Sequence, residues 1–213
     1  MNASDQKWLI EQIHASGHQL VLAITGGGSG GVAALLQVPG ASASILETIV
    51  PYSARAMRDW LGGSVDQYCS EKTARAMAMQ AFERARKLSD ADPHTLVGIG
   101  ATASLASNRP KRGAHRIHIA WPSASATAVA TCDFNTISAT RAEEEDVSTQ
   151  LILLTIAEAC GLPLLPSVES CLKIRVARRE QRAHESWTEL LLGHRSSISV
   201  HLNDAESQPM LLF

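Results

Sequence analysis

The segment between residues 25 and 31 is the strongest chemical signal in the sequence. It reads Thr25-Gly26-Gly27-Gly28-Ser29-Gly30-Gly31, after the apolar run 20–24 and before the apolar stretch 32–38. A glycine-rich turn between a strand and a helix directs several backbone N–H groups at one point, where an anion can bind. A close-packed turn without a ligand is the alternative. The sequence predicts phosphate-binding residues here, namely Thr25, Gly26, Gly27, Gly28 and Ser29.

The same glycines also fit a dinucleotide-binding pattern. Gly26, Gly28 and Gly31 satisfy G-x-G-x-x-G, and Glu47 follows at a distance suited to an acid that binds ribose. Two features disagree with it, because Glu47 falls inside the β-rich stretch 45–50 and Pro39-Gly40 interrupts the intervening helix. An NAD-dependent oxidoreductase is therefore only a third hypothesis. The absence of a Gly-Lys-Ser/Thr sequence excludes a Walker phosphate loop.

A second set of motifs follows the turn. Val38-Pro39-Gly40-Ala41-Ser42 is followed about ten residues later by Tyr52-Ser53, and a Leu-Gly pair comes after the next helix. This order resembles the C-terminal domain of the CinA competence/damage-inducible proteins, the nicotinamide-nucleotide amidase family. The resemblance covers about residues 5–161. It implies hydrolysis of the carboxamide of nicotinamide mononucleotide, with release of ammonia.

The resemblance also implies roles for single residues. The family's serine nucleophile corresponds to Ser42, which composition alone would make a turn or cap residue. Its lysine base corresponds to Met57, whose thioether cannot accept the serine proton. Tyr52 and Thr102 match further family motifs, and Arg141 occupies the place of a family arginine. We therefore expect Ser42, Tyr52 and Thr102 at the reacting end of a ligand, with amidase activity weakened or lost.

Three charged segments allow other interpretations. The basic loop 108–113 includes Arg109 and Lys111, which either remain solvated or join Arg141 in binding phosphate. His115 and His118 alternate along a predicted strand, where packing is the simpler interpretation and a catalytic base the other. Residues 143–146 are all acidic and are interpreted as the first turns of a helix, not as a metal cluster. We expect no metal and no cofactor.

The elements that must position these residues alternate along the chain. Helices are predicted from Ser4 to Gly17, over 32–38, from Ser53 to Gly62, after Ser70 and over about 141–160. Strands are predicted over 20–24, 43–52, 96–101, 116–121 and 127–134, the last two as a hairpin around 122–123. This alternation predicts an α/β protein, a three-layer α/β/α sandwich formed by residues 1–161.

The rest of the chain, residues 162–213, has a different character and is predicted to be a connector. It contains an alternating segment near 172–176, a helix over about 179–192 and another alternating segment at 198–202. The final run 209–213 resembles the opening strand of a cytidylyltransferase-like nucleotidyltransferase. The chain would then be a fragment of a longer fusion protein. A non-catalytic regulatory or oligomerisation module of such a transferase is the second hypothesis.

Composition excludes several other classes of protein. Of 213 residues 45% are hydrophobic, and the formal net charge is −2, which gives no global attraction to nucleic acid or anionic membrane. No apolar run approaches the ~20 residues of a membrane span, and residues 1–7 lack the pattern of a basic region followed by an apolar stretch, so we do not expect a secretory signal. The sequence has no Cys-x-x-Cys pair, and its four cysteines are widely separated: Cys69, Cys132, Cys160 and Cys171. This spacing favours reduced thiols in the cytoplasm over a disulfide scaffold or a zinc site. We expect a cytoplasmic homo-oligomer whose partner is a small nucleotide.

Overall fold

The protein is built on one mixed β-sheet. The computed structural model describes residues 1–108, 113–123, 126–134, 140–163, 176–182 and 184–197. In spatial order the six strands are β2 (Ile45–Ile49), β1 (Gln19–Thr25), β3 (Leu96–Ser104), β4 (Arg116–Pro122), β5 (Ala126–Asp133) and β6 (Val176–Arg182). The first three are parallel, and β4, β5 and β6 each run antiparallel to the preceding neighbour. The carboxyl ends of β1, β2 and β3 therefore meet at one edge.

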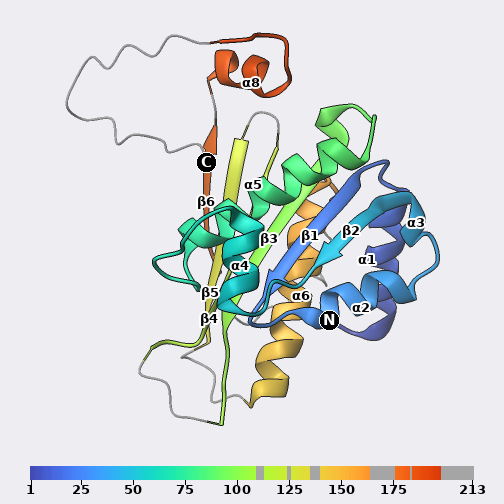
Figure 1. Cartoon of the computed structure of the whole chain (residues 1–213). Helices are drawn as coiled ribbons and strands as arrows, with labels where there is room; N and C mark the ends of the chain where they lie inside the picture. The colour runs from blue at the N-terminus through green and yellow to red at the C-terminus, as the bar shows by residue number, and fades with distance from the viewer. Residues whose placement is uncertain (109–112, 124–125, 135–139, 164–175, 183, 198–213) are drawn as a thin grey trace.

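Helices cover both faces of the sheet (Figure 1). They are α1 (Ala3–Ala15), α2 (Ser29–Gln37), α3 (Ala41–Ser44), α4 (Ala54–Leu61), α5 (Glu71–Leu88), α6 (Arg141–Ala159) and α8 (Glu185–Leu191), with a 3-10 turn η1 (Pro93–Thr95). Ser53, Ser70 and Thr140 cap the N-termini of α4, α5 and α6 by accepting a backbone N–H. The predicted α/β/α sandwich is thus confirmed.

Strand β1 shows how the two cores are separated. Leu20, Leu22 and Ile24 face α1, α2 and α6 in the larger core, whereas Val21 and Ala23 face α4 and α5. Successive side chains of a strand point to opposite faces, and a continuous apolar run is expected where both faces are covered. The periodicity also places the side chain of the next residue, Thr25, on the side of α4 and α5.

Helix α5 approaches strand β3 closely because of two glycines. A Cβ atom at Gly98 would lie 2.3 Å from the carbonyl oxygen of Ala78, and one at Gly100 would lie 2.3 Å from that of Ala74. The helix backbone therefore rests directly on the strand, which only glycine permits. Thr102 is the next residue on this face and lies beside the residues that precede α5, as its hydrogen bond to Tyr68 shows.

Most predicted elements are confirmed, including the hairpin of β4 and β5, but four details were wrong. Asn2, not Ser4, caps α1 through a bond from the Asp5 N–H. The stretch predicted as β-rich from residue 43 is helical to Ser44. Residues 179–182, predicted as helix, belong to the edge strand β6, and the helix that follows is the shorter α8. The sheet consequently extends beyond the expected domain boundary at residue 161.

Of the alternating segment predicted near 172–176, only Val176 is described, as the first residue of β6, and the predicted segments 198–202 and 209–213 lie outside the described residues. Among the residues that are described, no helix is long and apolar enough to span a membrane.

Candidate functional site

The glycine-rich turn binds an anion that belongs to the protein itself. Glu145 on α6 places Oε1 2.9 Å from the N of Gly28 and 2.7 Å from the N of Ser29, and the Ser29 hydroxyl donates to the same oxygen at 2.9 Å. Gly28 is the N-cap residue of α2 and adopts the left-handed conformation, with φ +88°. The turn therefore has the anion-binding geometry that the sequence predicts, but a carboxylate occupies the place expected for phosphate.

Arg141 lies one helical turn before Glu145 and faces the same region. Its Nη2 donates to the carbonyl oxygen of Gly26 at 2.9 Å and its Nη1 to that of Ala106 at 3.3 Å. Arg141 and Glu145 line a hollow of about 390 Å³ that we call the arginine hollow, together with residues that include Gly26, Gly27, Ser29 and Tyr52. The guanidinium thus fixes the carbonyl side of the turn while the carboxylate fixes the N–H side.

A second depression, the tyrosine hollow, adjoins it at the carboxyl edge of the parallel strands. It measures about 250 Å³, and its lining includes Thr25, Tyr52, Met57, Tyr68, Cys69 and Thr102. Thr25, Gly26 and Tyr52 line both depressions, so the two are continuous around Tyr52. Open α/β sheets bind ligands at the carboxyl ends of their strands. The sequence-predicted residues Thr25, Gly26, Tyr52 and Thr102 are therefore brought together.

The hydroxyl groups of the tyrosine hollow are positioned by backbone contacts. Thr25 donates to the carbonyl oxygen of Pro51 at 3.2 Å, and the buried Thr102 donates to that of Tyr68 at 2.7 Å. The Cys69 thiol lies 3.8 Å from two carbonyl oxygens, of Thr102 and Arg116. These contacts fix the loop before α5 against the ends of β3 and β4.

No charged side chain lines the tyrosine hollow in the described part of the chain. Met57, which is 2% exposed, contributes to its wall and also to the core under α4 and α5. Tyr52 is 68% exposed and Tyr68 41%, so both rings are available to an entering molecule. Aromatic rings, a thioether and hydroxyl groups suit a flat, weakly polar group, but they include no general base of the lysine type.

Ser42 is not brought to this edge. It is exposed in α3, which precedes β2, whereas Tyr52 follows β2. The five residues of β2 separate the two ends by roughly 16 Å at 3.3 Å per residue. Ser42 was expected beside Tyr52 and Thr102, but the structure places it at the other end of β2 and outside the lining of the tyrosine hollow. Arg109 and Lys111, also expected to bind phosphate, lie outside the described residues.

Glu47 is not placed to bind a dinucleotide. It lies in the middle of β2, opposite Val21 of β1, and Arg84 of α5 donates to its two oxygens at 2.8 and 3.2 Å. This pair lowers the pKa of Glu47, mainly through the hydrogen bond from Arg84. The acid of the G-x-G-x-x-G hypothesis thus has a structural partner away from the turn, which removes that hypothesis.

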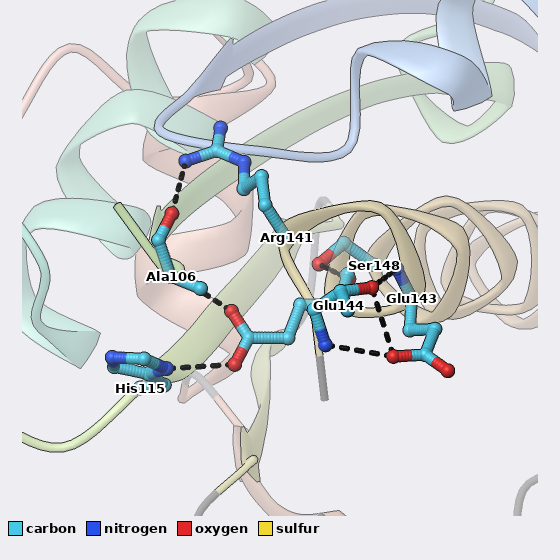
Figure 2. A network of polar contacts seen from close by, with 7 residues as sticks. Ala106, His115, Arg141, Glu143, Glu144 and Ser148 are labelled. Atoms are coloured by element: carbon cyan, nitrogen blue, oxygen red, sulfur yellow. Dashed lines mark hydrogen bonds and ion pairs between the residues drawn. The ribbon is translucent and has the colours of Figure 1, made fainter. Parts of the chain in front are cut away.

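The three consecutive glutamates at the start of α6 have distinct structural roles, of which those of Glu143 and Glu144 are seen in Figure 2. Glu143 forms a capping box with Thr140. Glu144, 1% exposed, accepts from the Ala106 N–H and lies 2.7 Å from Nδ1 of His115. Glu145 binds the glycine turn. Sequence reasoning missed the last two because it treated the acids as one solvated turn. The spacing of Arg141 and Glu145, four residues apart on one helix face, is the signal that could have indicated Glu145.

His118, the other histidine considered as a catalytic base, is buried and surrounded by structural contacts. Its Nδ1 lies 2.8 Å from the Thr131 hydroxyl, and Thr131 in turn donates to Glu71 at 3.1 Å. Burial lowers the pKa of His118. This histidine belongs to the face beneath α5 and does not line either hollow.

Comparison with known proteins shows a likeness of fold. No family model and no curated protein matches the chain. Among solved structures, competence/damage inducible protein CihA from Agrobacterium tumefaciens is 21% identical, with a TM-score of 0.53 over 79% of this chain and 98% of that one. A CinA superfamily protein from Klebsiella pneumoniae is 16% identical, with a TM-score of 0.59 over 76% and 99%. One from Escherichia coli is 21% identical, with a TM-score of 0.52 over 76% and 90%.

Proposed function

We propose that this chain is a ligand-binding domain with a CinA-like fold. Its ligand is similar to nicotinamide mononucleotide, with the ring in the tyrosine hollow and the sugar toward the arginine hollow. Support comes from the continuity of the two depressions around Tyr52 and from the uncharged, ring-compatible lining of the first. Thr25 and Thr102 offer hydroxyl oxygens that can accept from a carboxamide while they donate to backbone carbonyls.

The single observation that carries the proposal is the place of Met57. It is buried in the wall of the tyrosine hollow, at the sequence position where the resemblance implies a lysine base. A buried thioether favours contact with a ring and cannot take a proton from a nucleophile. The position of Ser42 at the other edge of the sheet also argues against amidase activity, because the implied nucleophile lies away from the hollow. The proposed domain therefore binds such a ligand and hydrolyses it slowly or not at all.

Calorimetric titration with nicotinamide mononucleotide and its nucleoside tests binding. Tyr52→Ala should raise the dissociation constant of the ligand by about tenfold, since stacking of a base on an aromatic ring contributes about 1–3 kcal/mol. Leu36→Ala is the matched control, because Leu36 is exposed on α2 and lines neither hollow. Absence of binding by either compound to the wild-type protein would refute the proposal.

An ammonia-release assay tests the loss of activity. The wild-type protein should release little or no ammonia from nicotinamide mononucleotide compared with a lysine-bearing CinA amidase. Release at a comparable rate would show that a different base operates and would contradict the role given to Met57.

A non-catalytic regulatory or oligomerisation module is the second candidate. One observation favours it: three sets of donors at the hollows already have protein partners, namely Pro51 for Thr25, Tyr68 for Thr102 and Glu145 for the turn. These donors need no ligand to complete their hydrogen bonds. A module of this kind would bind neither compound and would show a mass that rises with concentration in light scattering.

A further inference from the structure

The proposed ligand class can be refined from the charge at the glycine turn, an inference that rests on the proposed function. Phosphate binding at such a turn requires N–H groups that are free to donate. Here the N–H groups of Gly28 and Ser29 and the Ser29 hydroxyl all donate to one oxygen of Glu145, at 2.9, 2.7 and 2.9 Å. A carboxylate and a phosphate oxygen are acceptors of the same kind, so the two cannot occupy these donors together.

Glu145 is also held in place by its surroundings. The preceding turn of α6 is fixed by the Thr140–Glu143 capping box and by the contacts of Glu144 with Ala106 and His115. The other oxygen of Glu145, Oε2, is buried and has no hydrogen-bond partner among the described residues. A Cβ atom at Gly27 would lie 3.1 Å from it. The turn is therefore packed around the carboxylate, and the Gly28 and Ser29 donors are not available to a second anion.

Arg141 does not compensate for the negative charge of Glu145 at this site. It is the only cation in the described lining of the arginine hollow, and it already donates to the carbonyl oxygens of Gly26 and Ala106. No ion pair between Arg141 and Glu145 occurs in the described part of the chain, so the carboxylate charge is not cancelled by direct contact. One positive and one negative group together give no net attraction for a phosphate dianion.

We infer that Glu145 determines specificity by excluding phosphate, and that the site takes a nucleoside in preference to the corresponding nucleotide. The carboxylate fills the anion site, and like charge opposes a phosphate beside it. A sugar hydroxyl or a pyridinium ring carries no such penalty. The glycine turn is then a support for a resident acid, and the ligand's sugar end remains unphosphorylated.

Titration calorimetry with nicotinamide riboside and nicotinamide mononucleotide tests this inference in three proteins. The wild type should bind the riboside at least about tenfold more tightly, since like-charge contacts are costly. Glu145→Ala should abolish or reverse that preference. Asp146→Asn removes the same charge from the neighbouring exposed residue and should keep it. Tighter binding of the mononucleotide by the wild type, or an unchanged preference in Glu145→Ala, would overturn the inference.

If neither compound binds, the proposed function is refuted. A second measurement still tests whether Glu145 excludes phosphate. Inorganic phosphate is titrated into the labelled protein while the amide resonances of Gly28 and Ser29 are followed by NMR. They should be unaffected in the wild type and should shift saturably in Glu145→Ala, because removal of the carboxylate frees their N–H groups. Saturable shifts in the wild type, or none in the folded variant, would show that Glu145 does not exclude phosphate.

Discussion

Glu144 and His115 connect α6 to the start of β4, with 2.7 Å between Oε1 of Glu144 and Nδ1 of His115. Glu144 comes from α6, whereas His115 immediately precedes β4, and the second oxygen of Glu144 accepts the N–H of Ala106 just beyond β3. This carboxylate therefore joins the helix that carries Arg141 and Glu145 to the ends of two central strands (Figure 2). It fixes the start of α6, which supplies Arg141 and Glu145 to the lining of the arginine hollow.

Replacement of His115 by alanine should destabilise the protein. Glu144 is 1% exposed, and a buried acceptor that loses its partner costs about 1–3 kcal/mol. We expect the free energy of unfolding in urea to fall by that amount. His94→Ala, at an exposed position in η1, should change it by less than about 0.5 kcal/mol. Equal effects of the two substitutions would show that the Glu144 contact does not stabilise the fold.

Gly100→Ala should separate α5 from β3. The new methyl group would lie 2.3 Å from both the Ala74 oxygen and the Ala78 nitrogen, which are backbone atoms and cannot rotate away. Overpacking of this kind costs about 1–3 kcal/mol or more, so the melting temperature should fall by several degrees. Gly63→Ala is the control because no atom lies within 4 Å of its Cβ position. An unchanged melting temperature for Gly100→Ala would contradict the close approach.

Local patterns were sufficient to predict most of the fold. The apolar stretch 20–24 predicted a buried strand because β1 is covered on both faces, and Ser53 and Ser70 predicted the starts of α4 and α5 through their capping side chains. Residues 179–182 were assigned to a helix because their charged side chains fit one equally well. They form β6 because pairing with β5 satisfies their backbone, and a nonlocal contact of this kind leaves no local signal.

The site could be predicted only in part, for the same reason. Tyr52 and Thr102 were recognised from short motifs, and parallel strands bring the ends of such motifs to one edge. The sequence could not show that Ser42 lies before β2 and so at the opposite edge. It also could not show that Glu145, far along the chain, folds back onto Gly28, because that contact depends on the packing of α6 against α2.

His118 should make stability depend on pH. Burial lowers its pKa below the usual 6.5, so the unfolded chain binds a proton before the folded protein does. The free energy of unfolding should therefore decrease as pH falls from 6.5 toward the folded-state pKa, by at most about 1.4 kcal/mol per pH unit. Above pH 6.5 this contribution should be constant.

The variant His118→Gln isolates that contribution. Urea unfolding at a series of pH values should give a shallower decrease below pH 6.5 than in the wild type, because the group that takes up the proton is absent. Charged groups that act on His118, namely Glu71, Arg116 and Asp133, remain in both proteins. An identical pH profile in the variant would show that other groups account for the dependence.

Cys69 should be the thiol that reports on the tyrosine hollow. It is half-buried in the lining, whereas Cys132 and Cys160 are buried and burial raises their pKa to about 12 and about 11. In a Cys171→Ser background, iodoacetamide at pH 8 should modify Cys69 at least about tenfold faster than the other two, because the thiolate is the reactive form. Nicotinamide riboside should slow the modification, and Tyr52→Ala should remove this protection. Modification of Cys69 at the same rate with and without the riboside, as followed by peptide mass spectrometry, would place the ligand elsewhere.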